Sequence, residues 1–335
     1  MLGDTASPPP TGTTRGARIT PRLLASLAVV GALATGTAAN SWAGESAPPG
    51  DSAPAEATSP FTGLPAEPAP VLAVKIDNHK GARPQTALED ADIVFVEKVE
   101  GGLSRLLGLY SSKLPEAVGP VRSAREYNIE QLRMFDRPAL AYSGARADVV
   151  DMINASPLYG VSHEDFPDDY FRGTDHEAPH NLYGYPDKIL GEAPEASPSD
   201  DIGFRFGDEA PAGGTPTANR TVNYGAATTS FNWSAEEDRW LASFDDAPAM
   251  SSDGDRLGGK TIVVQKVAMP PDSGGETPYE ETVGTGSATV LRDGQAYETV
   301  WDRPTAEAGT TFTRADGEPM AFDRGQVWVV YEEAK

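Results

Sequence analysis

The stretch Gly119-Pro120-Val121-Arg122-Ser123-Ala124-Arg125-Glu126 predicts a strand that runs into a helix. Ser123 and Glu126 have the spacing of a capping box, in which each side chain bonds an unpaired backbone N–H of the first helical turn. The helix is therefore expected to begin at Ser123. Arg122 would lie just before it and Arg125 in its first turn, beside free N–H groups and the positive end of the helix dipole. This combination favours a bound anion but identifies no reaction.

The residues on both sides of this stretch predict an α/β domain over residues 71–192. A near-continuous apolar run such as residues 71–77 is typical of a strand that is covered on both faces of its sheet. Strands are expected at residues 71–77, 93–99, 103–110, 117–122 and 138–142, and helices at residues 124–135 and 145–154. Because strands and helices alternate, we expect a mixed sheet with flanking helices.

A second domain is predicted at residues 220–335. Residues 193–219 are rich in Pro, Ala, Ser, Asp and Gly and are expected to be a linker. Beyond them, short segments of alternating hydrophobicity are separated by Gly and Asp turns, at residues 221–224, 239–244, 261–267, 288–292, 296–301 and 327–331. This pattern predicts a smaller, mainly β domain.

The N-terminal residues predict export. In residues 1–43, three arginines precede an apolar run at residues 23–34 and a small-residue cleavage site at Ser41-Trp42-Ala43, as in a secretion signal. The apolar run is short for a membrane span, which needs about 20 residues. An uncleaved signal that tethers the protein to the membrane is the alternative. Residues 44–70 consist largely of Pro, Ala, Ser and Glu and predict a disordered spacer.

Composition excludes several kinds of site. With no cysteine, the chain can form no disulfide, thiolate metal site, cysteine nucleophile or lipid-modified cysteine. A formal net charge of −23 argues against nucleic acid as a partner. Residues 71–150 hold 11 Lys plus Arg and 11 Asp plus Glu, whereas residues 151–335 hold 13 and 34. An anion site would therefore be local to the neutral part, and the acidic remainder indicates either a solvated surface or a salty environment.

Four motifs follow one another along the first domain. They are Ile76-Asp77-Asn78-His79 with Ala82-Arg83-Pro84-Gln85, Val99-Glu100-Gly101-Gly102-Leu103-Ser104-Arg105, Gly119-Pro120-Val121-Arg122-Ser123-Ala124-Arg125, and Ala178-Pro179-His180-Asn181-Leu182. On these motifs the chain resembles the YerB-like family of bacterial cell-envelope proteins, and Gln326-Val327-Trp328-Val329-Val330 resembles part of that family's second domain. The resemblance implies a two-domain extracytoplasmic protein, usually anchored as a lipoprotein, with no established activity. This sequence departs from the family in having no cysteine after its signal.

The motifs are rich in groups that bind anions. Arginine side chains present planar forks that suit phosphate and carboxylate groups. The expected ligand-binding residues are Arg83, Arg105, Arg122, Ser123, Arg125, His180 and Asn181. The alternative is an internal ion-pair network, in which Arg105 and Arg125 neutralise Glu97 and Glu100 and bind no ligand. The pocket hypothesis requires the four arginines to converge on one open cleft.

Three residues are candidates for proton transfer at the same place: His79, Asp77 and Glu100. The alternative for His79 is that it hydrogen-bonds its own turn. His176-Glu177-Ala178-Pro179-His180 formally fits the zinc-protease motif H-E-x-x-H. That motif needs a regular helix, which Pro179 disfavours, so neither a metal site nor a cofactor is expected.

Three classes of function remain at this point. The leading hypothesis is an exported protein of the cell envelope that binds an anionic envelope ligand through its arginines. The alternatives are a hydrolase or transferase acting on a phosphate or glycosidic linkage of an envelope polymer, and a non-enzymatic scaffold that contacts envelope proteins. In each case we expect an extracytoplasmic location, with membrane contact only through an uncleaved signal.

Overall fold

The structure is a computed structural model that describes residues 57–335. The predicted signal at residues 1–43 and the first part of the predicted spacer, residues 44–56, lie outside the described residues. Residues 57–70 of that spacer are folded. Gly63 N donates to Ser59 O at 2.8 Å, and the ring of Phe61 is completely buried against Phe135. Gly325 N also donates to Thr62 O at 2.8 Å and Arg324 Nη1 to Gly63 O at 2.6 Å. The prediction of disorder is therefore wrong for residues 57–70, because Phe61 and these bonds hold the segment against the core.

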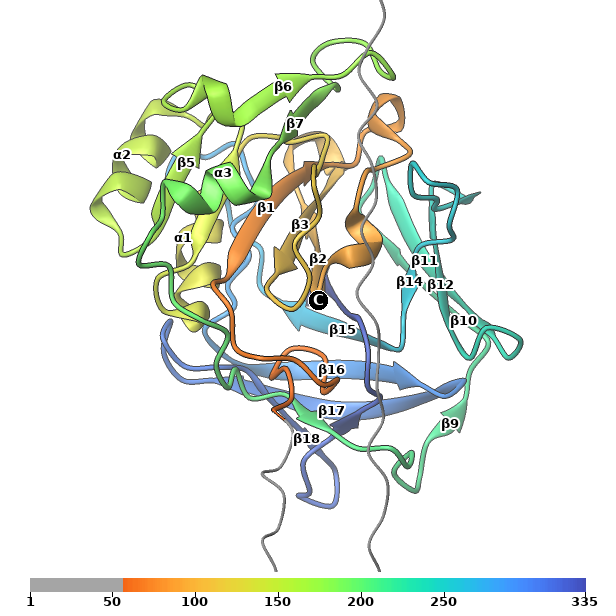
Figure 1. Ribbon diagram of the computed structural model, residues 1–335. Coiled ribbons are helices and arrows are strands. Elements are labelled where there is room, and N and C mark those ends of the chain that lie inside the picture. Colours follow the sequence, from red (N-terminus) through yellow and green to blue (C-terminus); the bar gives the residue numbers. More distant parts are fainter. Residues whose placement is uncertain (1–56) are drawn as a thin grey trace, which may run out of the picture. The chain divides into compact units, whose positions relative to one another are not determined.

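A large mixed sheet contains strands from both halves of the chain (Figure 1). Its order is β18-β17-β16-β15-β20-β2-β3-β1-β4-β5, and β9 pairs with β17 beside this path. The strands are β1 (Leu72–Asp77), β2 (Ile93–Lys98), β3 (Ser104–Tyr110), β4 (Ala139–Tyr142), β5 (Tyr159–Ser162), β9 (Thr215–Pro216), β15 (Thr261–Val267), β16 (Gly284–Arg292), β17 (Gln295–Arg303), β18 (Thr311–Arg314) and β20 (Val327–Glu333). Strand β1 runs parallel to β4 and antiparallel to β3.

The remaining elements surround this sheet. The helices are α1 (Tyr127–Leu132), α2 (Ala147–Ala155) and α3 (Pro186–Gly191), with short 3-10 segments at Lys80–Ala82, Leu88–Asp90, Glu100–Gly102, Arg133–Phe135 and Pro167–Asp169. A second sheet contains β10 (Asn219–Asn223), β11 (Thr228–Ser234), β12 (Arg239–Phe244), β13 (Ala247–Pro248) and β14 (Gly258–Gly259). Two further pairs are β6 (Tyr170–Arg172) with β7 (Leu182–Gly184), and β8 (Arg205–Phe206) with β19 (Ala321–Phe322).

Both faces of the large sheet are covered. On one face, helices α1 and α2 contribute Leu132 and Ile153 to an apolar cluster with alternate residues of the strands. On the other face, α3 and the second sheet contribute Ile189 and Trp240 to the opposite cluster. Figure 1 shows the helices and the second sheet at opposite ends of the view. Because side chains on both faces are buried, all six residues of β1 are apolar or internally paired, as the near-continuous run predicts.

Strand β20 joins the two halves of the chain. It lies between β2 and β15 and runs parallel to both, so that Trp328 is opposite Val94 on one side and Ile262 on the other. Trp328 is completely buried and its ring contacts Phe231 of the second sheet. The prediction of an α/β part followed by a mainly β part is confirmed, but the two parts share one sheet.

Residues 193–219, the expected linker, lie against the same core. Val71 N donates to Ser197 O at 2.9 Å, Ile202 is buried, and β8 pairs in parallel with β19 near the end of the chain. This polar, Pro-rich segment is therefore irregular but ordered, because its backbone groups hydrogen-bond to folded neighbours.

The structure corrects the prediction at residues 117–126. Val118, Gly119 and Val121 form only isolated bridges, and Pro120 cannot donate to a strand ladder. The capping box does not form, and α1 begins at Tyr127.

The reason lies in long-range backbone hydrogen bonds. Arg122 N donates to Lys75 O at 2.8 Å and Ala124 N to Gly144 O at 3.1 Å, which holds the chain extended where a helix was expected. The Glu126 carboxylate accepts from Ser273 N instead of returning to Ser123. The anion-binding argument from a helix N-terminus therefore does not apply at Ser123.

The shared sheet predicts that the two parts do not fold separately. A chain of residues 57–335 should unfold by heat or urea in one cooperative transition. A fragment of residues 57–200 should show no cooperative transition, because the β2 edge and the face under the second sheet would be exposed. Circular dichroism and calorimetry check this, and a fragment that melts cooperatively on its own would contradict it.

Candidate functional site

The buried carboxylate of Asp77 is the centre of the predicted site. It lies at the end of β1 with no exposed surface. One of its oxygens accepts from His79 N at 3.0 Å and lies 3.3 Å from Arg105 Nη1. The other lies 3.1 Å from Arg122 Nε and 2.7 Å from His180 Nδ1. Burial alone would raise the pKa of Asp77, but Arg105 and these hydrogen bonds hold it below its usual value.

Arg83 belongs to a neighbouring group of contacts. Its guanidinium donates to Asn78 Oδ1 at 3.0 Å and to Asn78 O at 2.6 Å. A third bond joins it to Asp245 Oδ2 at 2.9 Å, and it lies over the ring of Phe244. Gln85 Nε2 also donates to Asn78 Oδ1 at 3.0 Å. Arg83 therefore links the first motif to the turn that follows β12.

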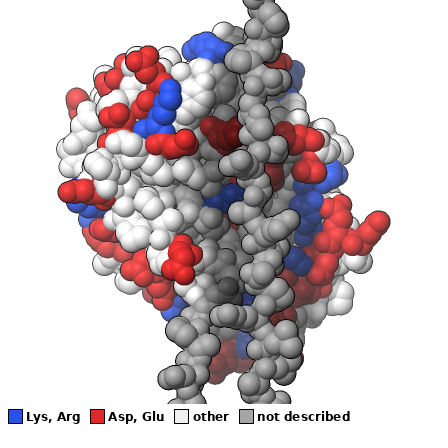
Figure 2. Space-filling view, in the orientation of Figure 1, with Lys and Arg blue, Asp and Glu red and all other residues white. Residues whose placement is uncertain are grey.

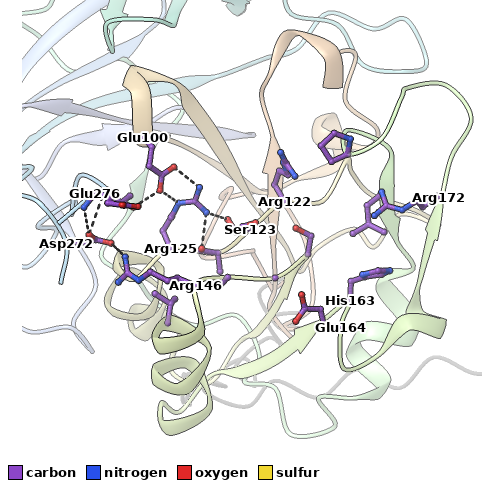
Figure 3. A pocket seen from close by; sticks show the side chains of 18 residues that line it. Glu100, Arg122, Ser123, Arg125, Arg146, His163, Glu164, Arg172, Asp272 and Glu276 are labelled. Atoms are coloured by element: carbon purple, nitrogen blue, oxygen red, sulfur yellow. Dashed lines mark hydrogen bonds and ion pairs between the residues drawn. The ribbon is translucent and has the colours of Figure 1, made fainter. Parts of the chain in front are cut away.

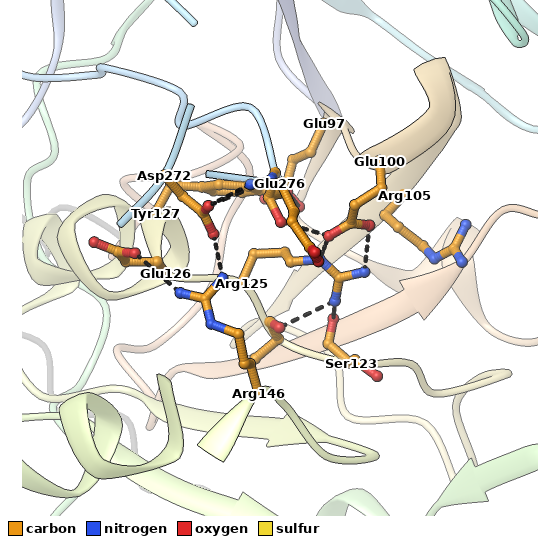
Figure 4. A network of polar contacts seen from close by, with 12 residues as sticks. Glu97, Glu100, Arg105, Ser123, Arg125, Glu126, Tyr127, Arg146, Asp272 and Glu276 are labelled. Atoms are coloured by element: carbon orange, nitrogen blue, oxygen red, sulfur yellow. Dashed lines mark hydrogen bonds and ion pairs between the residues drawn. The ribbon is translucent and has the colours of Figure 1, made fainter. Parts of the chain in front are cut away.

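Arg125 is bound to Glu100 by two parallel hydrogen bonds (Figure 4). Nε and Nη2 each lie 2.7 Å from a carboxylate oxygen, and Nη1 donates to Ser123 O at 3.0 Å. Thr277 Oγ1 donates to the same carboxylate at 2.5 Å. Burial raises the pKa of Glu100, but the bonds from Arg125 and Thr277 outweigh it and lower the pKa to about 2. Arg125 and Glu100 thus form the internal pair of the alternative hypothesis.

A second pair, Lys75 with Glu97, lies close to it and, unlike the first, is completely buried. Both side chains are completely buried and in direct contact. Asn128 Nδ2 donates to Glu97 Oε1 at 3.0 Å, and Tyr127 OH donates to Oε2 at 3.4 Å. Burial lowers the pKa of Lys75. Burial, aided by the Glu97 charge, raises the pKa of nearby Glu280 well above its usual value.

The arginines of the motifs line two different cavities. Arg122 and Arg125 line a cavity of about 520 Å³ that is closed on one side by residues of the second half, including Asp272 and Thr277 (Figure 3). Arg83 and Arg105 line a separate cavity of about 260 Å³. The four arginines therefore do not converge on one cleft, and only Arg122 and Arg125 remain on the larger one.

The contacts of Arg122 differ from those of the other three arginines of the motifs. Its Nε faces Asp77 at 3.1 Å, whereas Nη1 and Nη2 donate no hydrogen bond to any group within residues 57–335. A quarter of its side chain is exposed, and it faces the larger cavity. Asp77 therefore fixes the side chain and leaves its outer edge available.

The structure adds Arg172 and Arg146, which were not among the predicted residues. Arg172, at the end of β6, lines the larger cavity and donates from Nη1 to Asn181 Oδ1 at 2.8 Å. Arg146 also lines it, but binds Asp148 at 2.6 Å and Asp272 at 2.8 Å. The sequence offered only one signal for Arg172, the fourth motif, whose Asn181 orients it.

The candidates for proton transfer are all engaged in internal contacts. Asp77 is buried beneath its partners, and Glu100 is ionised at ordinary pH. His79 Nδ1 accepts from Gly81 N at 3.1 Å, so this histidine hydrogen-bonds its own turn. Its ring stacks on His180 with centroids 4.5 Å apart, and burial together with His180 lowers its pKa.

The residues of the formal zinc-protease motif do not have the geometry of that site. Residues 176–180 form turns instead of a helix. His176 Nε2 lies 3.2 Å from Pro84 O, while His180 is directed to Asp77, so the two imidazoles have different partners. Across residues 57–335 no group of three or more His, Cys, Asp and Glu side chains is placed to hold a metal ion. The same residues contain no helix long and apolar enough to cross a membrane.

Comparisons with known proteins agree with this architecture. The family "Protein of unknown function (DUF3048)" matches with its N-terminal domain at residues 61–199 and with its C-terminal domain at residues 220–329. A relative from Bacillus subtilis (strain 168), described as "Putative lipoprotein YerB", is 27% identical over 291 residues, which are 81% of this chain and 85% of that protein. The crystal structure of YerB from Bacillus subtilis has a TM-score of 0.73 at 24% identity and covers 82% of this chain and 96% of that one.

The buried pair predicts an asymmetric response to mutation. Lys75→Met should cost about 3–5 kcal/mol of unfolding free energy, because Glu97 would be left charged and buried without its partner. The double variant Lys75→Met/Glu97→Gln removes both charges and should recover most of that loss. Urea unfolding measures both. Equal stability of the single and the double variant would show that the charge of Glu97 is compensated elsewhere.

The pair of Glu100 with Arg125 predicts a dependence on pH. Because folding lowers the pKa of Glu100 from 4.5 to about 2, its contribution to stability is complete above pH 4.5 and is lost as the pH falls towards 2. In Glu100→Gln, the melting temperature should fall less steeply over this window than in the native protein. Glu236→Gln, an exposed carboxylate on the turn after β11, is the control. Parallel curves for Glu100→Gln and the native protein would contradict the assignment.

Proposed function

Since the chain belongs to the DUF3048 family, whose N-terminal and C-terminal domains match most of its length, we propose that it is an extracytoplasmic protein that binds the anionic group of an envelope ligand in the Arg122 cavity. This is narrower than a site formed by all four arginines of the motifs. The proposed ligand-binding residues are Arg122 and Arg172, together with Ser123, which lines the same cavity.

The observation that carries the proposal is that only one edge of the Arg122 guanidinium is engaged by the protein. A guanidinium has five N–H donors in a fixed plane, and in Arg122 the Nε side is held by a buried carboxylate while the outer edge faces a cavity. A side chain held in this way loses little conformational entropy when it binds a phosphate or carboxylate group. The contact with Asp77 therefore prepares Arg122 for an external anion.

Arg172 supports the same location. It forms no ion pair with a carboxylate in the part of the chain that the structure describes, and its one side-chain hydrogen bond is to Asn181. Figure 3 shows Arg122 and Arg172 on the same side of the cavity, away from the paired groups around Arg125. Two arginines from different elements can share one anion, and this arrangement favours a bound group over a solvated surface.

Binding is favoured over catalysis by the contacts of the predicted acids and bases. Asp77 and Glu100 are held in the ionised form by arginines, and His79 uses Nδ1 for its own turn. None of the three offers both a free proton site and a place on the larger cavity. A general acid or base needs both.

Two observations support the proposed extracytoplasmic location. The sequence of residues 1–43 predicts secretion, and the relative from Bacillus subtilis is described as a lipoprotein. In this chain a lipid cannot be attached through cysteine, because the sequence has none. We therefore place the protein outside the cytoplasm without assigning it a lipid anchor.

The surface charge restricts the ligand. With a net charge of −23 the molecule repels long polyanions, and Figure 2 shows acidic side chains distributed around the face on view. A compact ligand with one anionic group fits this surface better than a nucleic acid or a phosphate-rich polymer. Its affinity should fall as salt increases.

The proposal is tested with inorganic phosphate as the probe. Arg172→Gln should weaken phosphate binding about tenfold, as expected for a charge-assisted bond, with little change in melting temperature. Arg122→Gln should weaken it at least as much and also lower the melting temperature, since Asp77 loses a partner. Isothermal titration calorimetry and thermal unfolding measure the two effects.

Arg205→Gln is the matched control, because Arg205 is exposed on β8 and pairs with Asp201 away from the cavity. Unchanged phosphate binding in both Arg122→Gln and Arg172→Gln, or equal weakening in Arg205→Gln, would refute the proposal.

A further inference from the structure

We infer that the ligand of the Arg122 cavity carries a cationic group as well as an anionic one, so that the cavity selects a zwitterion. This inference rests on the proposed anion site and specifies its ligand. It follows from a comparison of the charged side chains that are paired with one another on the cavity wall with those that are not. Arg122 belongs to the second group, because its partner Asp77 does not line the cavity.

Most of the charges on the wall neutralise one another. Glu100 is paired with Arg125 by two hydrogen bonds. Asp272 Oδ2 accepts from Arg146 Nη1 at 2.8 Å, and Asp272 Oδ1 accepts backbone N–H groups of its own loop. These pairs fix one wall of the cavity and leave no charge for a ligand to compensate.

Four charged side chains of the wall remain. Two are the arginines of the proposed anion site, Arg122 and Arg172. The other two are carboxylates, Glu164 and Glu276, which line the cavity and whose oxygens have no hydrogen-bond or ion-pair partner among the described residues. Both glutamates are exposed to solvent.

The two carboxylates come from different parts of the cavity wall. Figure 3 shows Glu276 with Arg125, Arg146 and Asp272 on one side of the cavity, and Arg122 and Arg172 on the other. Glu164 comes from the loop after β5 and approaches Gly144, where a Cβ would lie 3.3 Å from its Oε1. In Figure 3 Glu164 lies on the side of Arg122 and Arg172, beside His163, so that one of the two carboxylates is found on each side of the cavity.

This arrangement determines which ligand binds best. A simple anion on Arg122 would meet unfavourable potential from the carboxylates, whereas a ligand with an ammonium group turned towards one of them would neutralise both signs. The carboxylates also act against ligands with a second anionic group, which is how unpaired charges give specificity. A cavity of about 520 Å³ has room for both ends of such a molecule.

The ligand class is thus a small molecule with a phosphate or carboxylate at one end and an amine at the other. Phosphate and carboxylate groups both suit a pair of arginines. The two kinds of ligand therefore share an anionic group and an ammonium group joined by a short linker. Aminoalkyl phosphates and amino acids with a free amine are the two classes of compound that meet this description.

Matched probe pairs test the inference on the protein of residues 57–335. Phosphoethanolamine is compared with ethyl phosphate, and β-alanine with propionate, because each pair differs only by the ammonium group. Calorimetry should show tighter binding of the zwitterion by about three- to tenfold, the range expected for ion pairs in a hydrated site. The pair with the higher affinity identifies the anionic group.

The double variant Glu164→Gln/Glu276→Gln should abolish this preference, mainly by improving the affinity for the simple anion. Glu236→Gln, which is exposed on the turn after β11, should leave the preference intact. Melting temperatures should not change in either variant, because the replaced carboxylates have no partners in the described residues.

The outcomes separate this inference from the proposal beneath it. If the simple anions bind through Arg122 at least as tightly as the zwitterions, the inference is overturned and the anion site stands. A preference that survives in the double variant also overturns it. If no probe binds, or binding is unchanged in Arg122→Gln, the anion site itself is refuted.

Discussion

The need to compensate one buried carboxylate organises this protein around Asp77. A charge without exposed surface is costly unless charged or hydrogen-bonded groups surround it. Those of Asp77 come from three other segments, since Arg105 is on β3, Arg122 precedes α1, and His180 precedes β7. The carboxylate therefore ties β1 and its ladder neighbour β3 to two segments outside the large sheet, and it places Arg122 at the cavity as a consequence.

The charged residues of this arrangement were predictable, but most of their partners were not. The motifs contain Arg105, Arg122 and Asp77 together, and the rule that buried charges are paired indicates that they meet. The partner of Arg83 is Asp245 and that of Glu100 includes Thr277, both from the second half of the chain. No local pattern connects residues so far apart in sequence. The sequence therefore indicated a charged cluster but not its division between two cavities.

In the fold, too, the sequence predicted local features but not the long-range contacts. Apolar runs predicted β1 and β15 to within a residue, because burial on two faces requires continuous hydrophobicity. The helix start was misplaced because the spacing of Ser123 and Glu126 satisfies a local rule, while the backbone there bonds Lys75 and Gly144. Likewise, nothing within residues 327–331 indicates that this strand inserts between strands of both halves.

The position of β20 also affects the order of assembly. Strand β2 is made early, yet its parallel neighbour is separated from it by most of the chain, so the middle of the sheet closes only after residues 327–333 are available. Contacts of such high sequence separation form slowly, and until then one edge of β2 lacks its neighbour. A chain of this kind therefore stays incompletely folded until synthesis reaches its last strand.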